Sequence, residues 1–339
     1  MKLKNKTYQE DYPRFYKNLG PFNLKQIKEF LNAEVLSKDQ DYLINDFKSI
    51  ESAGDHEIAF INDNYKYSEN KISASTLLIS KGNSNSFDGS INIVKVDNLH
   101  LSISILSNIF YEEFDAVMIG SLNKHTFIGE PDHLDDSAVI SNGVVIGKNA
   151  NIKSGVSIGY NCKIGNNVTI GNNSVISNAI IGDNVNIGRN CSIGQPGFGF
   201  ALNNFKNSNI YHKGCVIIQD NVQIGSNCCF DRGSFGQTII GENTYFDNLC
   251  HVAHNVQVGN NCIFAAMTGI AGSAKIGNFV FTGGQVGIGG HLNVGNNVQI
   301  AAQSGVFNDV DDNSSLMGSP AINKFTFLKS HKKRYERKN

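Results

Sequence analysis

The sequence predicts a mainly β protein: a left-handed parallel β-helix of hexapeptide repeats, preceded by a small α/β domain. Aliphatic residues recur every six positions over most of the chain, and Gly or Asn occupies many of the positions between them. A period of six is longer than strand alternation and does not match a helical turn, but it is typical of short strands joined by tight turns. The period is clearest in a run of twelve positions, eleven of them apolar: Ile240, Phe246, Val252, Val258, Phe264, Ile270, Ile276, Thr282, Ile288, Val294, Ile300 and Val306.

Three hexapeptides close one triangular coil in such a fold. Residues 18 apart in the uninterrupted run should therefore stack on adjacent coils, about 4.8 Å from one another. The inward aliphatic residues then form a column that no single coil could bury, but that about ten successive coils can.

Before the repeats, residues 21–120 mix helical and strand patterns and predict the small α/β domain. Leu24, Ile27 and Leu31 share one helical face, and residues 98–114 again keep helical spacing. Strand-like stretches cover residues 57–61, 76–79 and 91–96. Residues 1–20 show no clear period, so we expect an N-terminal extension there.

The β-helix is expected over residues 121–322, with two interruptions. The larger, residues 195–214, predicts an extruded loop with Phe198 and Phe200, whose apolar rings need another surface to cover them. The smaller includes Asp231, Arg232 and Gly233. Residues 323–339 form a strongly basic C-terminal tail.

Composition argues against several classes of function. The 29 Lys and Arg balance 30 Asp and Glu, which gives no reason to expect a nucleic-acid partner. We expect no signal peptide, and no run approaches the roughly 18 apolar residues of a membrane span. Seven Cys, an odd number without metal-ligand spacing, indicate reduced packing residues of a cytoplasmic protein.

His254 and Gly272 are the main candidates for chemistry. They lie 18 residues apart, so the imidazole and a backbone N–H of the glycine turn should sit one coil apart on one edge. That separation suits a base that deprotonates a nucleophile and a donor that holds an oxyanion. His291 lies 37 residues beyond His254, two coils on and displaced by one position, and could contact the same ligand. From spacing alone, a His in a repeat turn is more often a hydrogen-bonded surface residue than a catalyst.

Asp247 and Asn248 precede His254 by one face of the coil. Their side chains could orient the His254 imidazole or satisfy turn amides. We keep both as candidate substrate-binding residues.

Five short motifs stand out along the repeats and their interruptions: FDNLCHVAHNVQVG at residues 246–259, Gly283-Gly284, Gly290-His291, Gly197-Phe198-Gly199-Phe200 and Asp231-Arg232-Gly233. Together they resemble the UDP-3-O-acylglucosamine N-acyltransferase family of lipid A biosynthesis. The likeness covers roughly residues 20 to 325 and includes the α/β domain, which separates this family from the related UDP-N-acetylglucosamine O-acyltransferases.

The resemblance implies transfer of a 3-hydroxyacyl group from acyl carrier protein to the 2-amino group of UDP-3-O-acylglucosamine. The family's general base matches His254, its oxyanion-binding N–H matches Gly272, and an assisting His matches His291. No metal, cofactor or covalent enzyme intermediate is implied. The family forms a homotrimer with active sites between subunits, so Phe198 and Phe200 are expected to line a cleft made by two chains.

The family's uridine site is an aromatic residue followed by Asn-x-Lys-Tyr. Phe60, Asn64 and Tyr67 match it here, although the gap from Phe60 to Asn64 is one residue longer than the family pattern. Tyr65 therefore rivals Tyr67 for stacking on uracil. A Tyr-rich strand end that packs on its own domain is the alternative.

The basic tail suits the acidic surface of acyl carrier protein, but a solvated end explains it equally well, and the family usually ends in a longer helical segment. Two other functions compete with acyl transfer. One is a zinc hydratase of the γ-carbonic anhydrase type, for which His251, His254 and His291 have the wrong spacing. The other is a β-helix that only binds a nucleotide sugar or acts as a scaffold.

Overall fold

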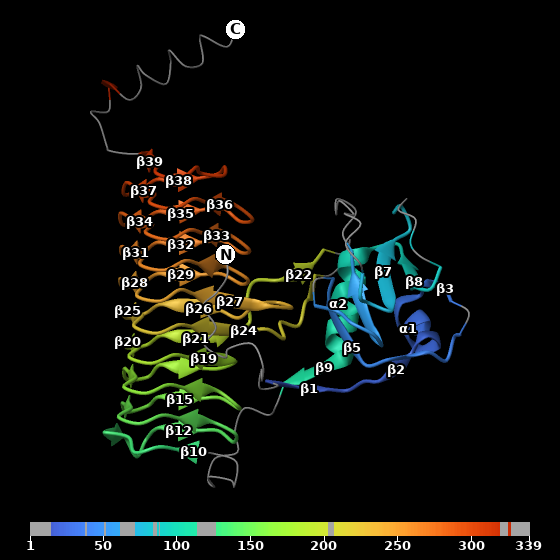
Figure 1. Ribbon diagram of the computed structural model, residues 1–339, viewed down its shortest axis with the longest axis horizontal. Coiled ribbons are helices and arrows are strands. Elements are labelled where there is room, and N and C mark those ends of the chain that lie inside the picture. The colour runs from blue at the N-terminus through green and yellow to red at the C-terminus, as the bar shows by residue number, and fades with distance from the viewer. Residues whose placement is uncertain are drawn as a thin grey trace.

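The computed structural model describes residues 15–37, 39–50, 52–61, 72–83, 87, 89–113, 127–202, 207–318 and 325–326. They form a tall three-sided β-helix with an α/β domain beside it (Figure 1). The predicted fold class, a parallel β-helix after a small α/β domain, is confirmed.

The β-helix has three parallel sheets, in which each strand pairs with the strand one coil away. Sheet I contains β10 (Phe127–Ile128), β13 (Val145–Ile146), β16 (Lys163–Ile164), β19 (Ala179–Ile181), β24 (Cys215–Ile218), β27 (Gln237–Ile240), β30 (Gln257–Val258), β33 (Lys275–Ile276) and β36 (Asn293–Val294). Sheet II contains β11 (His133–Leu134), β14 (Asn151–Ile152), β17 (Thr169–Ile170), β20 (Asn186–Ile187), β25 (Gln223–Ile224), β28 (Tyr245–Phe246), β31 (Ile263–Phe264), β34 (Phe281–Thr282), β37 (Gln299–Ile300) and β39 (Ser315–Leu316). Sheet III contains β12 (Val139–Ile140), β15 (Ser157–Ile158), β18 (Val175–Ile176), β21 (Ser192–Gln195), β26 (Cys229–Asp231), β29 (His251–Val252), β32 (Gly269–Ile270), β35 (Gly287–Ile288) and β38 (Gly305–Val306).

The register of the strands follows the predicted spacing. Ile240 pairs with Val258, and Val258 pairs with Ile276, so inward side chains 18 residues apart form one buried column. Where the chain is interrupted the spacing changes, and Ile193 pairs with Phe230. Six of the seven free Cys are buried, as expected for packing residues.

The α/β domain is built on a five-stranded sheet, two helices and short accessory strands. The sheet order is β3 (Glu34–Leu36), β8 (Asn92–Val96), β7 (Thr76–Ser80), β6 (Glu57–Phe60) and β5 (Asp46–Ser49). The helices are α1 (Leu24–Leu31) and α2 (Leu99–Phe110). The accessory pairs are β1 (Tyr16–Asn18) with β9 (Tyr111–Glu113) and β2 (Phe22–Asn23) with β4 (Leu43–Ile44). Strand β1 therefore joins the domain, although its residues fall within the predicted extension.

Local sequence explains both helices. Asn23 accepts the Gln26 N–H at the start of α1 while Gln26 accepts the Asn23 N–H, a reciprocal cap that satisfies two otherwise unpaired donors. Asn98 caps α2 through the Leu101 N–H. The apolar faces of both helices pack on the same face of the sheet, against Ile58 and neighbouring strand residues.

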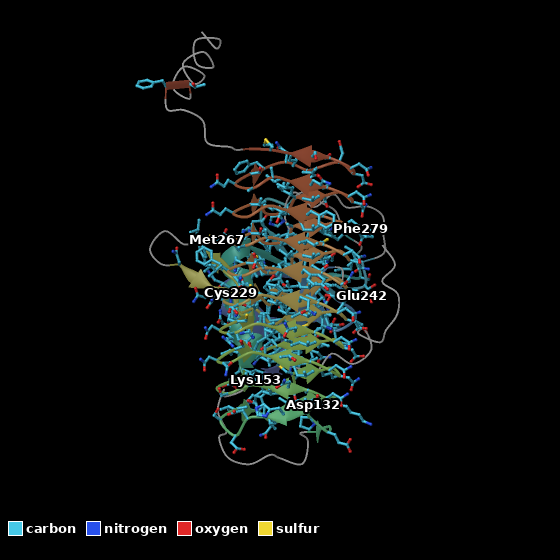
Figure 2. All side chains as sticks on the ribbon, turned by 90° about the vertical axis from the view of Figure 1, so that its left-hand side faces the viewer. Asp132, Lys153, Cys229, Glu242, Met267 and Phe279 are labelled. Atoms are coloured by element: carbon cyan, nitrogen blue, oxygen red, sulfur yellow. The ribbon has the colours of Figure 1, made fainter. Side chains whose placement is uncertain are left out.

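Sheet II lies on the side of the β-helix away from the α/β domain (Figure 1). Figure 2 looks onto that side, with Met267 and Phe279 at its margins. The outward residues Tyr245, Ile263 and Phe281 stack in register on three successive coils and are 44%, 48% and 39% exposed. Sheet II thus presents an apolar column that nothing within the described part of the chain covers.

The extruded segment joins the two parts of the molecule. Its antiparallel strands β22 (Phe200–Ala201) and β23 (Ser208–Asn209) extend from the β-helix toward α2 (Figure 1). At its end, the Lys213 ammonium is buried against the Asp46 carboxylate at 3.3 Å, the Tyr111 hydroxyl and the Phe47 carbonyl. Burial lowers the pKa of Lys213 to about 8.

Candidate active site

The candidate site lies on the edge of the β-helix where sheet III turns into sheet I. The His254 turn follows β29, the Gly272 turn follows β32, and the Gly290 turn follows β35. Both interruptions leave the β-helix at this same edge, because residues 196–214 follow β21 and residues 232–236 follow β26. The fold therefore gathers the irregular segments and the candidate base on one edge.

Gly272 lies directly against the His254 imidazole, one coil away. A β-carbon on Gly272 would stand 2.8 Å from both Nε2 and Cε1 of His254. The two turns are also tied through the backbone, since the Ser273 N–H donates to the His254 carbonyl at 2.9 Å. A side chain at position 272 would therefore displace the His254 ring.

On another edge of the β-helix, side chains cap the turn N–H groups of the coil below. On the edge after sheet I, the residue before each left-handed turn position donates its N–H to the Asn or Asp side chain one coil on. The donor–acceptor pairs of this ladder are Glu242 to Asn260 (3.0 Å), Asn260 to Asn278 (2.8 Å), Asn278 to Asn296 (2.9 Å) and Asn296 to Asp312 (2.6 Å).

The candidate edge lacks this ladder. His254, Gly272 and Gly290 hold the equivalent positions, each before a left-handed residue. Gly290 has no side chain with which to cap Gly272, and the Gly272 N–H has no acceptor among the residues that the structure describes. A bare N–H facing a substrate is the donor that an oxyanion needs.

Ser234 and Asn255 determine which ring nitrogen of the neutral His254 imidazole carries the proton. The Ser234 N–H donates to Asn255 Oδ1 at 3.0 Å, which identifies that atom as the amide oxygen. His254 Nδ1 lies 3.1 Å from the same oxygen and must therefore donate to it. The neutral imidazole consequently carries its proton on Nδ1 and leaves the lone pair of Nε2 free, beside Gly272.

His212 is a further member of the site that sequence analysis missed. Its ring lies edge-to-face with His254, with the ring centroids 5.2 Å apart. It is 2% exposed, and Nδ1 accepts the Gly197 N–H at 3.1 Å. Burial, together with positive charge on His254 and Arg232, lowers the pKa of His212 to about 4. His212 stands near the end of the extruded loop, where the repeat gives no guide to position.

The other predicted residues on this edge are His291, Phe198 and Phe200. The His291 N–H donates to the Gly272 carbonyl at 3.0 Å, and the residue is exposed. The Phe198 and Phe200 rings contact each other with centroids 4.9 Å apart, and Phe198 is 85% exposed. Both rings stand on the segment whose Gly197 contacts His254.

Asp247 and Asn248 lie on a different edge, after sheet II. Asp247 Oδ1 accepts the Asn248 N–H at 2.7 Å, and Asn248 Oδ1 accepts the Ser226 N–H at 2.8 Å. Of the two roles considered for them, they satisfy turn amides, and Asn255 is the residue that orients His254.

In the α/β domain, Phe60 packs between Phe47 and Phe235, with centroids 5.6 Å and 5.2 Å away. Asn64, Tyr65 and Tyr67 lie outside the described residues, as does nearly all of the basic tail.

Below His254, the carboxylate of buried Asp231 accepts a hydrogen bond from Gln195 Nε2 at 2.8 Å and lies 3.7 Å from His251 Nε2. Burial raises the pKa of Asp231. Over the described part of the chain, no three His, Cys, Asp or Glu side chains converge as metal ligands would. Within the same residues, no helix is long and apolar enough to cross a membrane.

Two family models match the β-helix. The bacterial transferase hexapeptide model, which has six repeats, matches residues 237–272, and the GMPPB C-terminal domain model matches residues 122–232. The fold and the site together thus define a transferase of the hexapeptide-repeat class. Among solved structures, UDP-N-acetylglucosamine acyltransferase from Campylobacter jejuni is 29% identical, with 52% of this chain and 68% of that chain covered and a TM-score of 0.47.

Curated relatives narrow the class to one family. UDP-3-O-acylglucosamine N-acyltransferase from Rickettsia akari is 37% identical over 268 residues, which cover 76% of this chain and 77% of that protein. The protein of the same name from Caulobacter vibrioides is 50% identical over 127 residues, and the match spans only 38% of its length. The chain belongs to the UDP-3-O-acylglucosamine N-acyltransferase family.

Proposed function

We propose that this protein transfers a 3-hydroxyacyl chain from acyl carrier protein to the 2-amino group of UDP-3-O-acylglucosamine, in lipid A biosynthesis. Family membership supports the reaction class. The observation that carries the chemistry is the pairing of the free Nε2 of His254 with the uncapped N–H of Gly272 on the adjacent coil.

In the proposed mechanism, the substrate amine attacks the thioester carbonyl carbon while His254 Nε2 takes the proton that the nitrogen must lose. The Gly272 N–H donates to the oxyanion of the tetrahedral intermediate. The new C–N bond forms, the C–S bond breaks, and the proton held by His254 passes to the leaving thiolate of the phosphopantetheine. His291 assists at the same centre from its place beside the Gly272 carbonyl.

The remaining predicted residues take substrate-binding roles in this proposal. Residues 21–120 form a uridine-binding domain, with Phe60, Asn64 and Tyr67 around the uracil. Phe198 and Phe200 offer apolar rings to an acyl chain, and Phe198 is open to receive one. Asp247 and Asn248 contribute to substrate binding from their own edge, and residues 323–339 supply positive charge for acyl carrier protein.

We also propose a cytoplasmic homotrimer with sites between subunits. The exposed apolar column of Tyr245, Ile263 and Phe281 supports an interface between copies, since it lies at the height of the candidate site and large apolar patches on a protein surface mark contacts.

The test is to incubate the purified protein with UDP-3-O-acylglucosamine and hydroxyacyl carrier protein and to follow the diacyl product by mass spectrometry. The product mass also gives the acyl chain length. We expect His254→Ala to lower turnover about 10²- to 10⁴-fold, the usual contribution of a general base. His133→Ala makes the same change at an exposed His far along the β-helix and should leave turnover unchanged. Folded wild-type protein that forms no product with any chain length would reject the function.

A further inference from the structure

His212 connects the extruded loop to the candidate base. It is buried, although it belongs to a segment that leaves the β-helix, and its ring meets the His254 ring at an interplanar angle of 76°. Nothing in the proposed chemistry uses this second imidazole. A buried polar side chain at such a position needs a physical explanation.

The Gly197 and Gly199 backbone closes around the His212 ring. Besides the Gly197 N–H that donates to Nδ1, a β-carbon on Gly199 would stand 2.2 Å from Nε2. A β-carbon on Gly197 would meet His254 Cβ at 2.8 Å. Because Gly197 and Gly199 have no side chains, the loop can close around the His212 imidazole and also contact His254.

The α/β domain holds the segment around His212 in place. Ser104 Oγ donates to the Asn209 carbonyl at 2.8 Å, and Ser107 Oγ accepts the Tyr211 N–H at 3.0 Å. On the other side of His212, the buried Lys213 ammonium contacts Asp46. His212 is thus held from both sides by contacts with α2 and β5.

We propose that His212 is a positioning residue for acyl transfer, which holds the His254 ring at the angle where Nε2 faces the Gly272 N–H. The role rests on the proposed function. His212 cannot itself take the amine proton, because the Gly197 N–H already occupies the Nδ1 lone pair. Its lowered pKa also keeps it uncharged beside His254 at neutral pH. A base whose ring plane is fixed needs no reorientation during reaction, and small misplacements of a catalytic group lower rates strongly.

Two substitutions of His212 separate positioning from packing. His212→Leu removes the acceptor for the Gly197 N–H, whereas His212→Asn keeps one, because Asn Oδ1 lies where the imidazole has Nδ1. We expect His212→Leu to lower kcat roughly 10- to 100-fold, with the KM for the nucleotide sugar nearly unchanged. His212→Asn should recover most of that loss. His133→Leu, at an exposed His, is the matched control.

The second readout does not depend on turnover. In ligand-free protein labelled with ¹⁵N-histidine, the His254 spectrum should show a protonated Nδ1 in the wild type and a mixture of tautomers in His212→Leu. If His212→Leu fails to fold, Gly199→Ala replaces it, because its methyl group must displace the His212 ring.

A wild-type His254 spectrum or wild-type kcat in His212→Leu, or in Gly199→Ala where that variant replaces it, overturns the positioning role. An equal loss of kcat in His212→Leu and His212→Asn overturns it as well. Wild-type protein without transferase activity, but with the expected spectral change in His212→Leu, rejects the proposed function and retains the positioning of the imidazole.

Discussion

Gly290 stands one coil beyond Gly272 on the edge after sheet III. On the edge after sheet I, the equivalent position carries an Asn whose side chain caps the turn N–H of the preceding coil. Because Gly290 has no side chain, the Gly272 N–H keeps no acceptor among the described residues. The donor proposed for the oxyanion thus depends on a residue that need not touch the substrate.

Gly290→Asn should restore the missing cap and occupy the Gly272 N–H. We expect kcat to fall about 10²- to 10³-fold, the usual cost of losing one oxyanion donor, with a smaller change in KM. Gly290→Ala adds a β-carbon without an acceptor, and its nearest contact would be the Gly272 carbonyl at 3.0 Å. Steady-state kinetics of Gly290→Asn and Gly290→Ala distinguish the two effects. An equal fall in kcat in both variants would indicate steric crowding rather than capping of the Gly272 N–H.

The apolar column on sheet II gives a test of assembly. Ile263→Glu places a charge among Tyr245, Ile263 and Phe281 and should convert the proposed trimer to monomers in sedimentation experiments. Gln299→Glu makes a similar polar change one coil further along the same column and should leave the trimer intact. A trimer that survives Ile263→Glu places the interface elsewhere.

The buried contact of Lys213 should matter to the docking of the α/β domain. Lys213→Met leaves the Asp46 carboxylate without its buried ammonium partner, which should cost about 3 kcal/mol of stability. Lys81→Met removes an exposed ion pair with Asp97 at 2.8 Å and should cost less than about 1 kcal/mol. Hydrogen exchange of amides in β5 and α2 measures the loss of stability in each variant. Equal protection in Lys213→Met and Lys81→Met would contradict the larger cost expected for Lys213→Met.

The pKa of His212 gives a pH dependence of stability. Burial lowers this pKa from the ordinary 6.5 to about 4 in the folded protein, so the unfolded chain binds the proton first as the pH falls. The stability from His212 is therefore complete above about pH 6.5 and is lost, by up to about 3 kcal/mol, between about pH 6.5 and pH 4. The thermal midpoint of the wild type should fall more steeply across that window than that of His212→Asn. Parallel curves of thermal midpoint against pH for the wild type and His212→Asn would show that folding does not lower the pKa of His212.

The sequence predicted the β-helix because period six is repeated in many coils, and it predicted both helices of the α/β domain. Strands β3 and β5 were missed, since three or four mixed residues such as Glu34–Leu36 have no readable period and become strands only by pairing with β8 and β6.

Coil arithmetic paired His254 with Gly272 correctly in space, because no interruption separates them. It could not find His212 or Ser234, which both lie in interruptions where sequence separation no longer gives position. Sequence spacing also did not predict which side chain orients the His254 imidazole. The structure shows that Asn255 Oδ1 does so, and the Ser234 N–H identifies that atom as the amide oxygen.

The ladder after sheet I has a direction. Each coil from Glu242 to Asn296 receives its acceptor from the next coil, and the last acceptor comes from Asp312. Loss of the C-terminal coil would strip the Asn296 N–H of its side-chain acceptor. Loss of the coil that carries Glu242 would remove no side-chain acceptor of this ladder, although it would remove the Glu242 carbonyl that accepts the Asn261 N–H. The polarity therefore belongs to the side-chain ladder, which loses an acceptor only when the coil at its C-terminal end opens.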